Sequence, residues 1–391
     1  MNQRQLFFKH VGQTSPSPLA IEIAKAEGSK LYDVKGKEYI DLIAGISVCN
    51  IGHRNPKVIR AIKKQLDCYL HILVYGEMIE SPQVQYASLL AKHLPSSLSS
   101  VYFTNSGAEA TEAAMKLAKR ITGRTQIIAF NQSYHGSTQG ALSIIGDEYW
   151  RNAYRPLLPD ILHLDYNDFS SLEYITNQTA CVIAETIQAE RGVYAPTKKW
   201  MKALQKRCNE TGTFFILDEI QTGFGRTGKL WGFEQFRVKP DMILLGKALG
   251  GGMPLGALVA GKKFMDAFTE HPVLGHITTF GGHPVSCAAG MAAMKVLLKE
   301  NIIQDVVEKS KLFTELLQHK KIKAVRCSGL LIAIEFDSFE TNKKIIDRCI
   351  EKGVLTDWFL FASECMRIAP PLTITRREIK KSVSIILDAM G

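Results

Sequence analysis

Four short apolar runs in the middle of the chain are each followed, within two residues, by a side chain that can take part in catalysis or ligand binding. These pairs are Val101–Thr104 with Ser106, Cys181–Ala184 with Glu185, Phe214–Leu217 with Asp218, and Met242–Leu245 with Lys247. Because ligands of open parallel sheets bind at the carboxyl ends of the strands, we expect these side chains to share one site. A charged residue that merely ends a strand explains any single case, but the four together favour a site.

Lys247 and Asp218 have the chemistry of a site that binds a carbonyl compound. Lys247 directly follows an apolar run and Gly246. Burial lowers the pKa of such a lysine and frees its amine as a nucleophile for Schiff-base formation. Asp218 can keep the nitrogen of a pyridine ring protonated, which makes the ring a stronger electron sink. Taken singly, Lys247 is equally explained as a strand-end lysine that reaches solvent, and Asp218 as a helix cap.

Ser106 begins a segment that fits both a helix cap and an anion site. Ser106 and Glu109 match the S-x-x-E capping box, and an amphipathic helix is expected over Glu109–Ile121. The free N–H groups of a first helical turn also favour a phosphate, and Gly107 allows it to approach closely. Tyr134, which follows the apolar run Ile127–Phe130, either stacks on a planar cofactor or packs in the core.

The stretch Gly223–Gly228 matches the pattern G-x-G-x-x-G, which would suggest a dehydrogenase that binds a dinucleotide. That fingerprint follows its strand at once and opens a helix. Here Asp218–Thr222 intervene, and Lys229–Phe233 has no helical pattern. The sequence therefore disfavours the dehydrogenase.

Composition narrows the class of protein further. The net charge is +10, but the basic residues are scattered, so we expect no nucleic-acid partner and interpret the charge as attracting acidic metabolites. None of the eight cysteines forms a C-x-x-C pair, and no metal-binding spacing occurs, so no metal is expected. No signal-peptide region or membrane-length apolar stretch is apparent, which predicts a cytoplasmic protein without a membrane partner.

The elements that must position these residues divide into three parts. Continuous apolar runs that alternate with helices, including Lys198–Glu210, indicate a mostly parallel α/β sheet buried on both faces. Towards the C-terminus we expect helices over 284–300, 303–319 and from Arg376, and strands at Leu330–Phe336 and Met366–Ile368. A hairpin is expected at Lys30–Tyr32 and Glu38–Asp41. The predicted division is an N-terminal segment 1–52 packing with the small domain, a large domain 53–282 and a small α+β domain 283–391.

Taken together, these residues resemble the class III (ω-) aminotransferases among the fold-type I pyridoxal-phosphate enzymes, above all the acetylornithine and ornithine aminotransferases. The likeness extends from Gly36–Asp41 to Met366–Pro371 and is most specific in Leu217–Gly228 and in Gly246-Lys247 with its following glycines. It implies pyridoxal 5'-phosphate as cofactor. The large domain would hold a mostly parallel seven-stranded sheet between helices, and a homodimer would share its active sites.

The resemblance also implies a role for each matching residue. Lys247 and Asp218 would be catalytic, with Lys247 bound to the cofactor and Asp218 paired with its ring nitrogen. Arg367 would bind a substrate carboxylate, and Glu190 would pair with Arg367 as a gate. The cofactor-binding residues would be Ser106, Gly107, Ala108, Tyr134, His135, Glu185, Asp218, Gln221, Lys247 and, reaching the neighbouring subunit, Thr279.

The sequence departs from that family pattern at one position that bears on the substrate. Ser137 stands where the acetylornithine and ornithine enzymes have an arginine that binds a second carboxylate. Ala189 and Thr186 replace a usual glycine and proline. The candidates for a substitute cation are Arg151, Arg155 and Arg191.

We therefore predict an aminotransferase that moves an amino group from an ω-amino donor, such as ornithine or acetylornithine, to a 2-oxo acid by a ping-pong Schiff-base mechanism. The alternatives are another class III specificity, for 4-aminobutyrate, lysine or a β-amino acid, and a pyridoxal-phosphate aminomutase, racemase or decarboxylase. A dehydrogenase and a non-catalytic binding protein are the remaining rivals.

Overall fold

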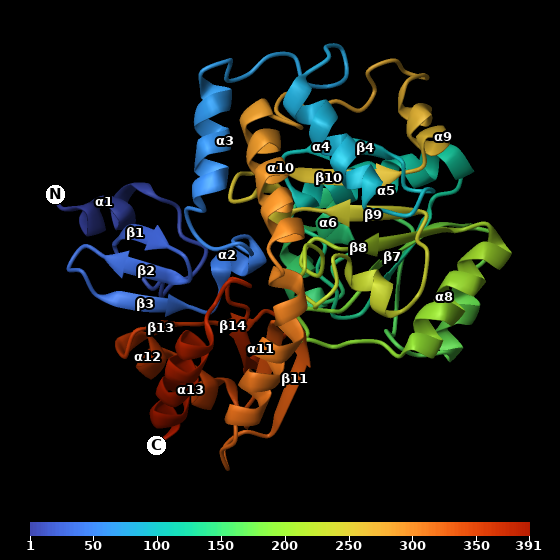
Figure 1. Ribbon diagram of the computed structural model, residues 1–391. Coiled ribbons are helices and arrows are strands. Elements are labelled where there is room, and N and C mark those ends of the chain that lie inside the picture. Colours follow the sequence, from blue (N-terminus) through green and yellow to red (C-terminus); the bar gives the residue numbers. More distant parts are fainter.

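The computed structural model describes residues 1–391, and a seven-stranded sheet lies at the centre of its larger domain (Figure 1). In spatial order its strands are β4 (Ser100–Thr104), β10 (Gly256–Ala260), β9 (Met242–Leu245), β8 (Phe214–Asp218), β7 (Thr179–Glu185), β5 (Gln126–Phe130) and β6 (Ile161–Leu164). Only β10 runs against its neighbours, so the mostly parallel sheet is confirmed. The six apolar runs that the sequence marks, namely the four above together with Ile127–Phe130 and Ala257–Ala260, are all strands, and β6 is an additional one.

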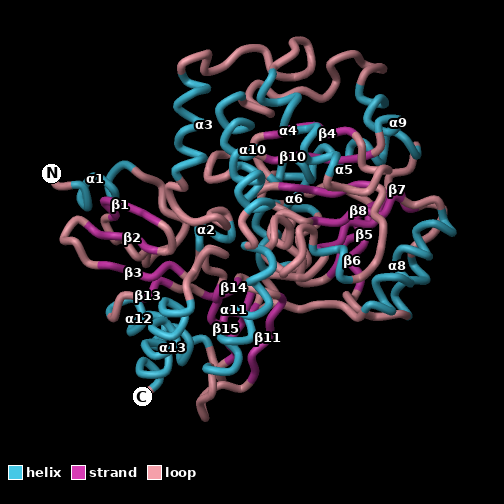
Figure 2. Tube along the Cα trace, viewed as in Figure 1, coloured by secondary structure: helices cyan, strands magenta, loops and turns pink.

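Helices cover both faces of this sheet, as Figure 2 shows. Helix α5 (Gly107–Thr122) packs across β10, β9 and β7, and α8 (Lys198–Thr211) packs against β8 and β7. Alternate side chains along one strand enter different hydrophobic clusters: Ile127 lies in the cluster with α5, and Ile128 in the cluster with α8. This period of two buries the strands on both faces, which is why their runs are continuously apolar.

The long helix α10 (Pro284–Lys299) connects the two domains and packs against α3 (Pro56–Leu66) and α4 (Ser81–Lys92). The small domain follows it, with α11 (Ile302–Leu316), β11 (Ala324–Ser328), β12 (Leu331–Glu335), α12 (Phe339–Glu351), β13 (Val354–Leu355), β14 (Trp358–Phe359), β15 (Ala362–Ile368) and α13 (Arg376–Met390). The second sheet has the order β11-β12-β15-β14.

The N-terminal strands form a third sheet with a strand from the far end of the chain. Its order is β1 (Ile23–Glu27), β2 (Lys30–Asp33), β3 (Glu38–Asp41) and β13, which lies parallel to β3. In Figure 1 the blue N-terminal strands lie beside the red C-terminal helices. The division at residues 52 and 282 stays a prediction. The remaining short helices are α1 (Gln3–His10), α2 (Ala44–Ser47), α6 (Gln139–Ser143), α7 (Glu148–Arg151) and α9 (Lys262–Met265).

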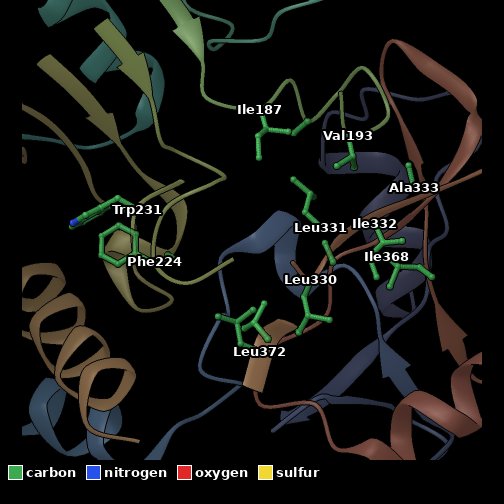
Figure 3. Close-up of a cluster of buried hydrophobic side chains, with 14 of the residues drawn as sticks. Ile187, Val193, Phe224, Trp231, Leu330, Leu331, Ile332, Ala333, Ile368 and Leu372 are labelled. Carbon is green, nitrogen blue, oxygen red and sulfur yellow. The ribbon is translucent and has the colours of Figure 1, made fainter. Parts of the chain in front are cut away.

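One buried hydrophobic cluster continues across the junction between the domains. Figure 3 shows Ile187, Phe224 and Trp231 of the large domain with Leu331 and Leu372 of the small domain, all members of that cluster. None of the helices combines the length and the apolar character that a membrane crossing needs.

Arg226, in the glycine-rich stretch Gly223–Gly228, lies at this junction and is fully buried. Its guanidinium donates to Leu330 O at 2.8 Å, to Pro370 O at 2.7 Å and to Asn50 Oδ1 at 2.6 Å. Turns and bends make up the stretch, and the element that follows is a short 3-10 helix, Gly232–Gln235, not an α-helix that opens directly after the glycines. The glycine motif that resembled a dinucleotide fingerprint thus connects three distant segments of the chain.

Candidate active site

A cavity of about 480 Å³ opens at the carboxyl ends of β7, β8 and β9, beside the start of α5. Parallel strands place the residues that follow them along one edge of the sheet, which is why separate segments of sequence meet here. Nine of the twelve predicted site residues line the cavity: Gly107, Ala108, Tyr134, His135, Glu185, Glu190, Asp218, Gln221 and Lys247.

Lys247 follows β9 in a turn with a backbone φ of +48°, an uncommon conformation for a residue with a side chain. Its Nζ donates to Gln221 Oε1 at 2.9 Å. Burial lowers the pKa of Lys247, and the nearby carboxylates of Glu190 and Asp218 oppose that shift. The amine therefore loses its proton more readily than an exposed lysine does, as a nucleophile requires.

Asp218 ends β8, and two hydrogen bonds fix its carboxylate. His135 Nδ1 lies 2.7 Å from Oδ2, and the backbone N–H of Ile220 donates to Oδ1 at 2.9 Å. The His135 side chain is fully buried, and its Nε2 has no hydrogen-bond partner in the protein. The imidazole thus holds the carboxylate in one orientation towards the cavity, because its ring has no alternative partner.

Glu185 ends β7 and holds the loop that carries Tyr134. Its two carboxylate oxygens accept from the backbone N–H groups of Tyr134 at 2.9 Å and of Ala189 at 3.0 Å. Burial raises the pKa of Glu185 to about 7, with a contribution from Asp218 that His135 opposes. Glu185 thus connects two loops of the cavity wall.

The first turn of α5 offers unpaired backbone donors to the cavity. The N–H groups of Gly107 and Ala108 have no acceptor in the protein. Ser106 caps the helix by accepting from Glu109 N at 3.2 Å. The Glu109 carboxylate accepts from Asn105 N and not from Ser106 N, so the predicted capping box is only half formed.

The opposite wall approaches this turn so closely that Gly136 has no room for a side chain. A Cβ on Gly136 would lie 2.5 Å from Ala108 Cβ, and the φ of +126° also favours glycine. Of the predicted cofactor-binding residues, Ser106 and Thr279 do not line the cavity, and Thr279 is exposed in the loop that precedes α10.

Arg367 lies behind Glu190 and not in the cavity wall itself. The Glu190 carboxylate accepts from Arg367 Nη1 at 2.8 Å and from Nη2 at 3.0 Å, in the bidentate geometry typical of this pair. A second carboxylate, from Asp357, accepts from Arg367 Nε at 2.8 Å. Sequence reasoning missed Asp357, because no motif surrounds it.

The position that departs from the family pattern stays without a cation. Ser137 Oγ lies 2.9 Å from the Tyr134 hydroxyl. Arg151 and Arg155 both pair with Glu148, at 2.8 and 2.5 Å, and do not line the cavity. Arg191 also lies outside it and donates to Gln188 Oε1 at 3.1 Å. None of the three predicted substitutes reaches Ser137.

These residues fit pyridoxal phosphate. Free amide donors at a helix start suit its phosphate, the fixed carboxylate of Asp218 suits its ring nitrogen, and a lysine with a lowered pKa suits its aldehyde. On a mostly parallel seven-stranded sheet, this combination defines a fold-type I pyridoxal-phosphate enzyme.

Comparison with known proteins narrows the class. Residues 11–390 match the family model "Aminotransferase class-III". The chain is 37% identical to the acetylornithine aminotransferase of Methanopyrus kandleri, over 100% of this chain and 99% of that protein. It is 38% identical to the acetylornithine aminotransferase of Bacillus cereus, over 94% of each chain. The chain therefore belongs to the class-III aminotransferases.

Solved structures agree with this assignment. The ornithine aminotransferase of Toxoplasma gondii, crystallised with pyridoxal phosphate at partial occupancy, superimposes with a TM-score of 0.91 at 29% identity. The match covers 99% of this chain and 93% of that one. The predicted family, fold type, transaminase activity and pyridoxal-phosphate dependence are confirmed.

Proposed function

We propose that this class-III aminotransferase takes an amino group from an ω-amino donor of the ornithine type and passes it to a 2-oxo acid. The observation that carries the proposal is a nucleophilic lysine, Lys247, in one cavity with a fixed carboxylate, Asp218. The names of the relatives in Methanopyrus kandleri and Bacillus cereus support an ornithine-type donor.

When bound, pyridoxal phosphate supplies an aldehyde carbon and an electron-withdrawing ring. Lys247 is proposed to hold that aldehyde through Nζ, and then to move the proton at the substrate carbon with the same nitrogen. Asp218 keeps a proton on the ring nitrogen, and His135 holds Asp218 in place through the bond of 2.7 Å. The N–H groups of Gly107 and Ala108 bind the phosphate.

Glu190 and Arg367 are proposed to separate the two substrates. While Glu190 and Arg367 are paired, the terminal nitrogens of Arg367 are not available to a substrate carboxylate, so an uncharged or cationic ω-amino end fits beside the pair. With Glu190 displaced, the two terminal nitrogens of Arg367 can bind the carboxylate of a 2-oxo acid in a bidentate manner. One site can thus accept two substrates in turn.

We further propose a homodimer with shared active sites in the cytoplasm. Two neighbouring loops expose large apolar side chains, with Ile79 94%, Val273 72% and Phe280 53% exposed, as an uncovered subunit interface would. His71 of the first loop packs against Phe280 of the second, and the centres of their rings lie 4.7 Å apart. Thr279 lies in the second loop, where it can reach a neighbouring site. All eight cysteines are free thiols, which suits a reducing compartment.

A panel of ¹⁵N-labelled donors with separate 2-oxo acids tests the proposed activity. Ornithine, acetylornithine, 4-aminobutyrate and lysine would each be combined with pyruvate or 2-oxoglutarate. We expect the label to appear in the amino acid derived from the acceptor. Label that stays within the donor skeleton would indicate an aminomutase instead. Borohydride reduction and peptide mapping should place the cofactor on Lys247, and an adduct on another lysine would contradict the assignment.

A further inference from the structure

Two groups of residues contact the guanidinium of Arg367: a fixed side, formed by residues of its own β-hairpin, and a removable side, formed by Glu190 from another loop. On the fixed side, Nε donates to Asp357 Oδ1 at 2.8 Å and Nη2 donates to Trp358 O at 3.0 Å. The guanidinium carbon lies 4.5 Å from the centre of the Phe359 ring. All three contacts come from strand β14 or the residue before it, in the same hairpin as Arg367. The removable side is Glu190, which belongs to the loop after β7.

The backbone of that hairpin is held as firmly as its side chains. Arg367 N donates to Asp357 O at 2.8 Å, and Thr356 Oγ1 donates to Arg367 O at 2.5 Å. Trp358 is paired with Met366 in the antiparallel ladder. Asp357 is therefore attached to the strand of Arg367 by main-chain bonds, and its position does not depend on the large domain.

Glu190 and Asp357 use different edges of the guanidinium. Glu190 accepts from Nη1 and Nη2, the two terminal nitrogens, although Nη2 also donates to Trp358 O in the hairpin. A substrate carboxylate that binds in the same bidentate geometry would need these two nitrogens and would compete with Glu190. It would not compete with Asp357, because that carboxylate accepts from Nε.

We infer that Asp357 is a positioning residue for substrate recognition: it keeps the guanidinium of Arg367 in place when a substrate carboxylate replaces Glu190. The inference rests on the proposed function and deepens it. Without an acceptor at Nε, the long side chain of Arg367 could follow Glu190 and lose the orientation that a carboxylate needs. Because Arg367 and Asp357 together are neutral, a carboxylate is recognised through hydrogen-bond geometry more than through net charge.

The charge states agree with this arrangement. Burial raises the pKa of Asp357 to about 6, and Arg367 opposes that shift, so the carboxyl group is largely ionised at neutral pH. Burial lowers the pKa of Arg367, but Glu190 and Asp357 carry it above its ordinary value. The contact between Arg367 and Asp357 is thus a pair of opposite charges that persists after Glu190 moves.

The test compares acceptors that differ only in a carboxylate, with the cofactor-loaded enzyme and its best donor. Pyruvate would be paired with acetaldehyde, and 2-oxobutanoate with propanal. The variants are Asp357→Ala, which removes the acceptor for Nε, and Asp357→Asn, whose amide oxygen can still accept. Asp347→Ala, in a surface pair with Lys343 on α12, is the matched control for loss of a carboxylate in the same domain.

For Asp357→Ala we expect the KM of each 2-oxo acid to rise about tenfold or more, the effect of losing one charge-assisted hydrogen bond, with kcat changed less than about twofold. Acetaldehyde and propanal should react as with the wild type, and Asp357→Asn should restore most of the affinity for 2-oxo acids. An equal loss with acids and aldehydes, or an Asp357→Asn variant as impaired as Asp357→Ala, would overturn the inference. Failure of the wild type to transfer nitrogen at all would instead refute the proposed function.

Discussion

Replacing Arg226 with methionine should destabilise the junction between the two domains. Methionine is similar in length and apolar, so it fills most of the space but donates no hydrogen bond. Three buried acceptors would lose their donor: Leu330 O, Pro370 O and Asn50 Oδ1. The glycine-rich stretch and its three partners come from separate parts of the chain, so one side chain connects all of them.

The expected loss follows from the contacts. A buried acceptor left unpaired costs about 1–3 kcal/mol. Arg226 has no carboxylate bonded to it, and its Nε has no hydrogen-bond partner, so removal of its charge also relieves a desolvation cost. The lower end of the range therefore applies to each acceptor, and we expect the free energy of unfolding to fall by about 3 kcal/mol.

Urea unfolding at saturating pyridoxal phosphate, followed by far-UV circular dichroism and tryptophan fluorescence, measures this loss. The control is Arg377→Met, because Arg377 is exposed on α13 and its loss should change stability by about 0.5 kcal/mol or less. If Arg226→Met lowered the free energy of unfolding by less than about 1 kcal/mol, the view that these hydrogen bonds hold the two domains together would be refuted.

Three further predictions concern the cavity. Gly136→Ala should weaken pyridoxal-phosphate binding about tenfold or more in a spectral titration, because the new Cβ displaces Ala108 and its backbone donor; unchanged affinity would contradict the fit. Ser137→Arg should raise kcat/KM for 2-oxoglutarate relative to pyruvate about tenfold by adding a cation, whereas Ser137→Ala should leave that ratio unchanged. Glu185→Gln should flatten the decline of stability with pH. Burial raises the pKa of Glu185 from its ordinary value of 4.5 to about 7. Between these two pH values the folded protein keeps the Glu185 proton, whereas the unfolded chain has released it. The resulting stability is fully present below pH 4.5 and is lost as pH rises through 7, by at most about 3 kcal/mol in unfolding experiments at pH 5 and 8.

Residues that follow a strand directly could be predicted from the sequence, because a parallel sheet brings the ends of its strands together whatever the rest of the fold does. Asp218, Glu185 and Lys247 were found in this way. Strand β6 was not, because His163 interrupts its short apolar run. Only half of the capping box of α5 was predicted correctly. The spacing identifies Ser106 as the cap, but the rotamer of Glu109 decides which backbone N–H its carboxylate accepts from, and this is the N–H of Asn105.

Asp357 could not be predicted for a different reason. It lies ten residues before Arg367, and the register of the β14–β15 hairpin alone determines that the two side chains meet. Thr279 marks a further limit, since its predicted partner is a second copy of the chain. The failure of Arg151, Arg155 and Arg191 to reach Ser137 also depends on long-range packing, which no local pattern records.

The parallel pairing of β3 with β13 has a consequence for how the chain reaches its native state. Residues near position 40 must wait during synthesis until residues near position 354 have left the ribosome before their sheet is complete. Until then one edge of the N-terminal hairpin has unpaired backbone groups, which can associate with other chains. The large domain has all seven strands of its sheet by residue 260, so it can form first, and the two ends of the polypeptide come together last.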